Sequence, residues 1–427
     1  MKYTSFIKKP VDIKGEEKKV QTLICLSCDL VVSVPQQKVA AKILCPRCNH
    51  LLLTNYKAPL NLLISFTLSA LIFFLLSLAF PFMSYDASGS ERIISLAHSV
   101  TTLISLDYYL LAGLLVMTIL LLPAGFLGGL LYILLPLKFN KRLPYTPAVL
   151  KMSLMMLPWS MVEIFLISVL VSIIKLTSTA DIGLGLSFYA FALFSVFMTA
   201  TVLYLNADQI WSWISTPLPA NTVAQGGALK QNLTACHLCH ASVPLNLPNC
   251  QRCGSKVSAR KPYSVQRTWA FLAIAMLLYV PANILPIMQT RIMGKDQFNT
   301  IIDGVQVLWN HGSYPIAMIV FIASVIIPIT KMLALSWLSF SVMFKKTDRL
   351  REKTIAYRII EFIGRWSMLD VFVVALLVSL IHQGKFLAVY PGPAIIAFAG
   401  VVIFTMLATK SFDSRLLWDQ REHENHT

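Results

Sequence analysis

Long apolar stretches, separated by short polar segments, run through most of the chain. Each is about as long as the roughly 20 helical residues needed to cross a hydrocarbon core about 30 Å thick. The stretches are continuous apolar runs and not ten-residue alternations, so they predict transmembrane helices rather than barrel strands. We expect eight spans, at residues 60–84, 107–137, 154–176, 185–206, 268–290, 313–343, 362–382 and 391–410.

The apolar pattern occurs twice. The residues from Trp159 to Phe165 read WSMVEIF, and they return 207 positions later, from Trp366 to Phe372, as WSMLDVF. Each half contains four cysteines followed by four predicted spans. An even number of spans makes the repeats parallel, related by an axis near the membrane normal. Further pairs at nearly the same spacing are Trp211 with Trp418, Pro81 with Pro286 and Pro123 with Pro328.

Composition and charge agree with a membrane protein and predict its orientation. Hydrophobic residues make up 56% of the 427 residues and charged residues 13%, against about 25% charged residues in a typical soluble domain. Basic residues gather in the loops 138–151 and 345–358 and are sparse in the loops 85–106 and 291–312. Because basic loops stay on the cytoplasmic side, we expect both termini and both cysteine sets there. The net charge of +16 then reflects orientation and anionic headgroups rather than nucleic acid.

All eight cysteines fall into two sets of four. Each set contains two Cys-x2-Cys pairs, with sixteen residues between the pairs in the first set and ten in the second. Two such pairs offer four thiolates in a tetrahedron, which suits a structural zinc ion and leaves no open catalytic position. We therefore expect two zinc ions per chain, with the ligands Cys25, Cys28, Cys45, Cys48, Cys236, Cys239, Cys250 and Cys253.

Other interpretations of the cysteines stay open. Four thiolates also suit iron, and a redox dithiol pair is conceivable. His50, His237 and His240 lie beside the thiols and could replace a ligand, although we favour ordinary solvent-facing histidines. The spacing of each cysteine set matches a zinc ribbon, a small metal-binding module. Such a ribbon is too small for a hydrophobic core of its own, so metal binding would supply most of its folding free energy. Since basic residues are sparse and no aromatic platform is present, we expect the ribbons to dock on each other or on the membrane helices.

Together these features predict an all-α polytopic membrane protein, made of two parallel repeats of four transmembrane helices, each preceded by a small cytoplasmic zinc ribbon. No cleavable signal is expected in the first 50 residues. The expected domains are a first ribbon at 1–57, a first membrane module at 58–216, a linker with the second ribbon at 217–262, and a second module with the tail at 263–427.

The second half carries polar residues where the first half is apolar. Lys331 and Thr405 correspond to Phe126 and Met198 of the first half. An ionisable side chain in a bilayer costs about 2.5–3.5 kcal/mol on insertion scales, so such residues are expected to face the bundle interior. We interpret Ser324, Lys331, Ser367, Asp370 and Thr405 as a candidate polar cluster, which forms a polar pathway or a proton-responsive site.

A less specific interpretation of the same residues is also open. Asp370 would pair with Arg365 near the cytoplasmic interface, and Lys331 would extend along the helix to the headgroups. Glu163 of the first half fits either a buried neutral carboxyl or an interfacial one.

Several motifs together resemble one known family. These are the two four-cysteine sets, VPANILPIM at Val280–Met288, PITK at Pro328–Lys331, GRWSMLD at Gly364–Asp370 and DSRLLWD at Asp413–Asp419. The combination is similar to the paraquat-inducible protein A family, and the likeness covers nearly the whole chain. The first half departs from the motif, since Pro158 and Phe126 replace the arginine and the lysine, and a scaffold or lateral-gate role suits it better.

The resemblance implies a multi-pass protein of the Gram-negative inner membrane that works with a periplasmic tunnel built from MCE domains. It implies that lipids move between the two membranes and that the five residues of the polar cluster serve this transport. Protonation of Asp370, coupled to Lys331, would switch the cluster between two arrangements.

No enzyme motif accompanies these features. The sequence has no Walker motif, no Ser-His-Asp arrangement and no open metal site. We therefore expect a lipid transporter or loader that is not an enzyme and has no nucleic-acid partner. The alternatives are a passive membrane anchor for the tunnel protein, an ion-coupled exporter of small toxic molecules, and a redox sensor that uses the cysteines.

Overall fold

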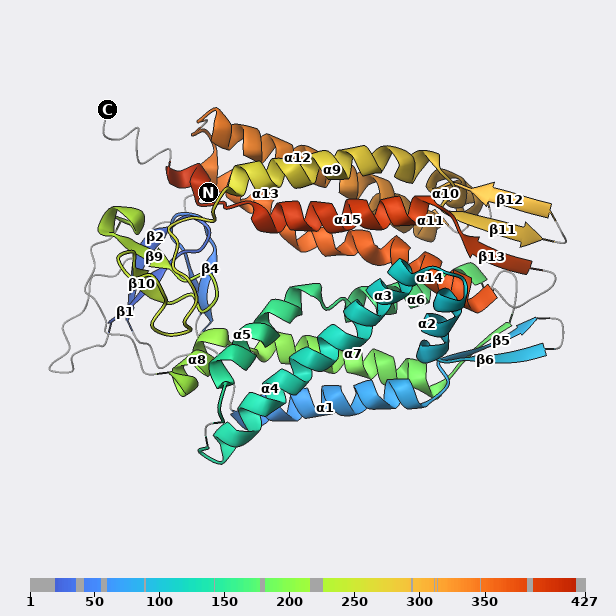
Figure 1. Cartoon of the computed structure of the whole chain (residues 1–427), viewed down its shortest axis with the longest axis horizontal. Coiled ribbons are helices and arrows are strands. Elements are labelled where there is room, and N and C mark those ends of the chain that lie inside the picture. The colour runs from blue at the N-terminus through green and yellow to red at the C-terminus, as the bar shows by residue number, and fades with distance from the viewer. Residues whose placement is uncertain are drawn as a thin grey trace.

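A computed structural model describes residues 20–419, except for 36–41, 55–59, 88–89, 142, 177–180, 216–225, 293–294, 311, 313, 346 and 382–386. The two halves lie side by side as elongated helical bundles (Figure 1). Both cysteine-bearing segments lie at one end of the bundles, and two small β-sheets lie at the other (Figure 1). The repeats therefore run in the same direction, as predicted.

The first module, residues 60–215, is built from helices of unequal length. Its long helix α1 packs along α7. The elements are α1 (Leu60–Ala79), α2 (Leu96–Ser105), α3 (Tyr109–Leu115), η1 (Val116–Leu121), α4 (Leu122–Lys138), α5 (Thr146–Met156), η2 (Leu157–Trp159), α6 (Val162–Leu176), α7 (Leu186–Tyr204) and α8 (Ala207–Ile214).

The second module, residues 264–419, repeats this order. Here α9 packs along α15 as α1 packs along α7. The elements are α9 (Ser264–Ile284), α10 (Ile301–Asn310), α11 (Tyr314–Phe321), η4 (Ile322–Ile326), α12 (Ile327–Met343), α13 (Leu350–Ile363), η5 (Gly364–Met368), α14 (Leu369–Ile381) and α15 (Ala394–Ser411).

Seven helices in the described part of the chain are long and apolar enough to cross a membrane. They include the two longest predicted spans, 107–137 and 313–343, which the structure gives as Tyr109–Lys138 with 30 residues and Ala317–Met343 with 27. The predicted span 362–382 differs, because the five-residue 3₁₀ segment η5 interrupts it and leaves α14 with 13 residues. At 1.5 Å per residue α14 is about 20 Å long, which is short of a full crossing.

Equivalent prolines of the two halves lie beside equivalent irregularities in their helices. Pro123 and Pro328 follow directly after the π-helical segments η1 and η4. A proline lacks the N–H of a regular helical turn, and a local π-turn is one way in which a helix accommodates this loss. The same local departure from regular α-helix therefore stands beside the equivalent proline in both halves.

The sheets were not anticipated in the all-α prediction. In the first module β5 (Met83–Ala87) pairs with β6 (Ser90–Ile94) and β7 (Asp181–Leu184). In the second module β11 (Met288–Ile292) pairs with β12 (Lys295–Asn299) and β13 (Leu387–Pro391). β5 and β11 begin within a few residues of the ends of α1 and α9. The predicted spans 60–84 and 268–290 extend into these two strands, because apolar content alone does not mark the end of the helix.

Two equivalent glycines allow each sheet to meet its helix. A Cβ built on Gly185 would lie 2.1 Å from the Pro81 carbonyl oxygen, and one built on Gly392 would lie 2.1 Å from that of Pro286. These positions accept no side chain without a shift of the backbone. The close approach lets Gly185 donate to Phe82 and Gly392 to Ile287 through their backbone N–H groups.

The two modules meet along α6 and α14. The rings of Phe165 and Phe372, which are repeat equivalents, lie edge to face with centroids 5.8 Å apart. The Ser168 hydroxyl donates to the Leu369 carbonyl over 3.1 Å. Contact between equivalent residues places the pseudo-two-fold axis here, as at an isologous interface. At the sheet end the Tyr108 hydroxyl donates to the Pro391 carbonyl over 2.6 Å.

Candidate metal sites and the cavity between the modules

The cysteines form two closed clusters. Within each cluster all four sulfur atoms lie within 4.8 Å of one another. Four sulfurs placed about 2.3 Å from a central ion lie roughly 3.8 Å apart. The closest pairs fit this spacing: Cys25–Cys48 at 3.5 Å, Cys28–Cys45 at 3.5 Å, Cys236–Cys253 at 3.5 Å and Cys239–Cys250 at 3.6 Å. The thiols are free of disulfides, and the donor set can hold one metal ion in each cluster.

One backbone turn is used four times to build these clusters. In every Cys-x2-Cys pair the backbone N–H of the residue after the second cysteine donates to the carbonyl of the first. That residue has a positive φ in all four turns, namely Asp29, Asn49, His240 and Gly254. Asparagine, aspartate and glycine tolerate this left-handed conformation best. The turn aims both thiols of a pair at one point.

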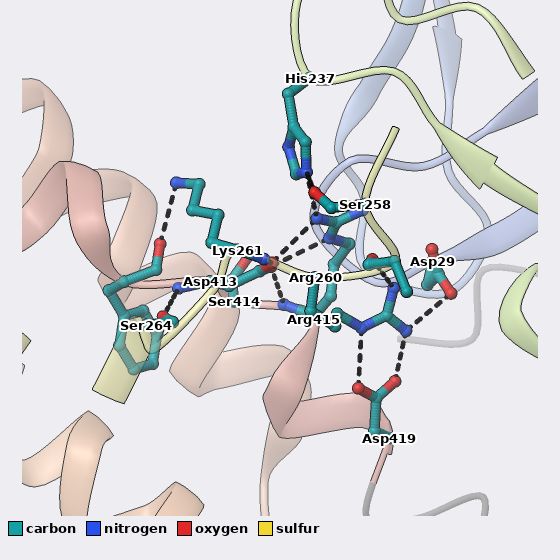
Figure 2. A network of polar contacts seen from close by, with 12 residues as sticks. Asp29, His237, Ser258, Arg260, Lys261, Ser264, Asp413, Ser414, Arg415 and Asp419 are labelled. Atoms are coloured by element: carbon teal, nitrogen blue, oxygen red, sulfur yellow. Dashed lines mark hydrogen bonds and ion pairs between the residues drawn. The ribbon is translucent and has the colours of Figure 1, made fainter. Parts of the chain in front are cut away.

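The neighbouring histidines are not members of the four-sulfur clusters. His237 lies instead in a polar network, with its Nε2 atom 3.3 Å from the Ser258 hydroxyl and 3.4 Å from Arg415 (Figure 2). Burial lowers the pKa of His237 and of His50.

The first ribbon, residues 20–54, docks on the second module. Arg358 of α13 donates to the carbonyls of Cys48 over 2.9 Å and Asn49 over 3.3 Å. The guanidinium of Arg47 lies over the Trp418 ring, 4.3 Å from its centroid. The ribbon that precedes the first module in sequence is thus held by the second.

The second ribbon, residues 226–260, docks on the end of the first module. Arg252 donates to the Asp208 carbonyl over 3.1 Å and to the Ser215 hydroxyl over 3.3 Å. Arg47 and Arg252 each directly precede the last cysteine of their set. An arginine at the equivalent position therefore contacts the end of a module in both ribbons. The ribbons also pair with each other, because β2 (Leu30–Pro35) is antiparallel to β8 (Gly226–Gly227).

A charged network joins both ribbons to the end of the chain. Arg260 forms ion pairs with Asp29 of the first ribbon, at 2.8 Å, and with Asp419, whose two carboxylate oxygens accept from it (Figure 2). Beside it Arg415 donates twice to Asp413, over 2.9 and 2.8 Å. Burial raises the pKa of Asp413, but hydrogen bonds and charge from Arg415 lower it more, leaving a pKa of about 2.

A cavity of about 500 Å³ lies between the two modules. It lies towards the ribbon end of the bundle, since Arg358 both contacts the first ribbon and lines it. The first module contributes Leu157, Pro158, Ser160, Val162, Glu163, Met198 and Val202, and the second contributes Lys331, Arg358, Glu361, Phe362, Gly364, Met406, Thr409 and Lys410. The walls therefore combine apolar side chains with charges of both signs.

Lys331 is the buried cation of this cavity. Its side chain is 3% exposed, and its ammonium donates to the Thr405 hydroxyl over 3.1 Å. The structure thus brings together two residues of the predicted cluster from α12 and α15. Lys331 lies inside the bundle rather than along its outer surface, so the headgroup-directed alternative does not describe this structure.

The other predicted cluster residues are placed less completely. Ser324 and Ser367 are buried, and the Ser324 hydroxyl donates to the Val320 carbonyl over 2.5 Å. Asp370 belongs to α14 by its backbone, but its side chain and that of Arg365 lie outside the described part. Glu163 is exposed and accepts from the Thr199 hydroxyl over 2.7 Å. It lines the cavity, so the buried alternative for it is wrong.

Sequence reasoning missed two cavity residues. Lys410 of α15 places its ammonium 4.3 Å from the centroid of the Trp159 ring, and this contact crosses from one module to the other. Arg358 had been counted only as a basic loop residue. Both owe their position to packing between segments far apart in sequence, which one sequence does not reveal.

Comparison with known proteins identifies the family. The family model for paraquat-inducible protein A matches residues 60–215 and 265–422, once in each half. Intermembrane transport protein PqiA of Escherichia coli (strain K12) is 35% identical over 410 residues, which cover 95% of this chain and 97% of that protein. The lipophilic envelope-spanning tunnel protein A of the same organism is 30% identical over 403 residues, covering 94% and 92%.

A third relative, a probable intermembrane transport protein of Haemophilus influenzae, is 29% identical over 410 residues, covering 94% of this chain and 97% of that protein. No solved structure matches the chain. The apolar helices make it a multi-pass membrane protein, and its relatives are named as transport proteins. The matches in both halves show that the chain belongs to the paraquat-inducible protein A family.

Proposed function

We propose that this chain is an inner-membrane lipid transporter or loader, which passes lipids to or from a periplasmic MCE tunnel protein. The observation that carries the proposal is the cavity between the modules, with the buried ammonium of Lys331 in its wall. A phospholipid offers apolar chains and an anionic phosphate, and this lining suits both. The relatives, one named for intermembrane transport and one named a lipophilic envelope-spanning tunnel protein, support a transport role.

The proposal includes an orientation and a metal. Both ribbons and both termini face the cytoplasm, and the two sheets face the periplasm, where they lie nearest to a tunnel partner. Each cysteine cluster holds a structural zinc ion, which supplies folding free energy to its ribbon and no chemistry.

The energy source belongs to the proposal as well. Protonation of Asp370, coupled to Lys331, would switch the cluster between two arrangements and so drive the cycle. A proton gradient should then change the rate of lipid transfer by the wild type and should have no effect on transfer by the Asp370→Asn variant.

Photo-crosslinking tests where the lipid binds. A phospholipid with a photoreactive acyl chain, reconstituted with the protein, should label peptides that line the cavity. Val202→Trp places an indole in the cavity wall and should reduce this labelling roughly tenfold, which corresponds to about 1.4 kcal/mol. Val196→Trp is the control, because Val196 lies on the same helix, is 61% exposed and is not a lining residue.

The same experiment separates transport from anchoring. A passive anchor predicts labelling spread over the outer helix faces and unchanged by Val202→Trp. That outcome would contradict the proposed function.

A further inference from the structure

Gly364 lies where the Lys331 ammonium needs space. A Cβ built on Gly364 would lie 2.8 Å from Lys331 Nζ and 3.0 Å from its Cε. Real Cβ atoms almost never approach another heavy atom within 3.0 Å. The lysine side chain therefore occupies the volume that any side chain at position 364 would take.

The backbone does not require glycine at this position. Gly364 has φ −58° and ψ −25°, which every L-residue adopts readily. It stands where α13 passes into η5, and glycine is less favourable there than alanine because it loses more conformational freedom on folding. A positive φ, the usual reason for a glycine, is absent, so the reason lies in the neighbouring side chain.

The first half provides an internal comparison. Leu157 is the repeat equivalent of Gly364, and Phe126 is that of Lys331. Phe126 is fully buried. A large apolar pair in the first half is thus replaced in the second by a lysine and a residue without a side chain, so the glycine is found in the half that carries the lysine.

We propose that Gly364 is a positioning residue, which forms the seat that holds the Lys331 ammonium beside Thr405 in the cavity wall. Alanine at position 364 displaces the ammonium from the Thr405 hydroxyl, which accepts from it over 3.1 Å. The ammonium has no room to retreat on the Gly364 side. That the seated ammonium then serves lipid transfer rests on the proposed function, whereas the seat itself does not.

A double-mutant cycle tests the seat without reference to transport. Gly364→Ala should lower the melting temperature of the purified protein by about 1–3 °C, because the end of the Lys331 side chain must shift to make room for the new Cβ. In the Lys331→Ala background the space is empty, and the same change should be neutral or slightly stabilising. The control is Gly128→Ala in α4, where the new Cβ meets nothing within 4 Å, and it should be neutral or slightly stabilising by the same amount in both backgrounds.

Each outcome of the cycle decides the inference. An equal loss of stability in both backgrounds, or none in either, would overturn it. If Gly364→Ala does not fold, recovery of folding in the double variant supports the seat, and failure of both variants contradicts it.

Lipid transfer is measured on the same variants. A clear stability coupling with unchanged lipid transfer would leave the seat intact and refute its part in the proposed function.

Discussion

The buried charges of Lys331 and Asp413 are each held by a specific partner. Lys331 donates to Thr405 from a seat that lacks a side chain, and Asp413 is bound by both arms of Arg415. Breaking a buried pair by removing one partner costs more than the pair contributes, because the other charge is left without compensation. Single substitutions at these residues should therefore have large effects.

Asp413 makes a pH-dependent contribution to stability. Its pKa of about 2 lies below the usual value of 3.8, so its contribution is fully present well above pH 3.8 and is lost as the pH falls from about 5 through about 2. Asp413→Asn should lower the free energy of unfolding at pH 7 by about 2 kcal/mol or more. Chemical denaturation at several pH values should show the difference narrowing below pH 5, to about half at pH 3.

Asp348→Asn is the control for this series, because Asp348 is exposed and its replacement should leave stability unchanged. A difference for Asp413→Asn that stays constant from pH 7 to pH 3 would show that the carboxylate charge is not its source.

Some elements of the fold could be predicted from the sequence and others could not. Continuous apolar runs predicted the long helices, and the Cys-x2-Cys spacing predicted both clusters, because these features depend on residues close together in the chain. The first ribbon docks on the second module and the second ribbon on the end of the first module. This exchanged docking was not predictable, since Arg358 and Cys48, which form one of the contacts, are 310 positions apart. The 3₁₀ segment η5 and the short strands were missed because apolar content does not distinguish them from the ends of spans.

The exchanged docking predicts separate local effects for the two metal sites. Cys48→Ser removes a thiolate from the first cluster, so it should release one metal ion per chain and increase amide exchange in the first ribbon and α13. Cys253→Ser should do the same for the second ribbon and α8. Metal analysis and hydrogen exchange by mass spectrometry measure both responses. Identical exchange patterns in the two variants would contradict the prediction that loss of each metal site affects its own ribbon and the helix on which that ribbon docks.

The whole molecule combines a symmetric frame with an asymmetric interior. Equivalent phenylalanines meet on the axis between the modules, and equivalent glycines admit the sheets at the far end. The interior differs, because the first module contributes mainly apolar residues to the cavity and the second contributes three of its cations, Lys331, Arg358 and Lys410. In the proposed function, this asymmetry serves the binding of a lipid.

Lipid transfer by the Lys331→Met variant tests this claim most directly. The variant is compared with Lys353→Met, because Lys353 is also buried at 4% exposure but lies outside the cavity, near the Trp337 ring. Transfer of labelled phospholipid from proteoliposomes to an MCE acceptor protein is the measurement. We predict a loss of about tenfold or more for Lys331→Met, as expected for a lost charge-assisted hydrogen bond of about 1.5–3 kcal/mol, and nearly wild-type transfer for Lys353→Met. Equal transfer by both variants, with both folded, would contradict the account.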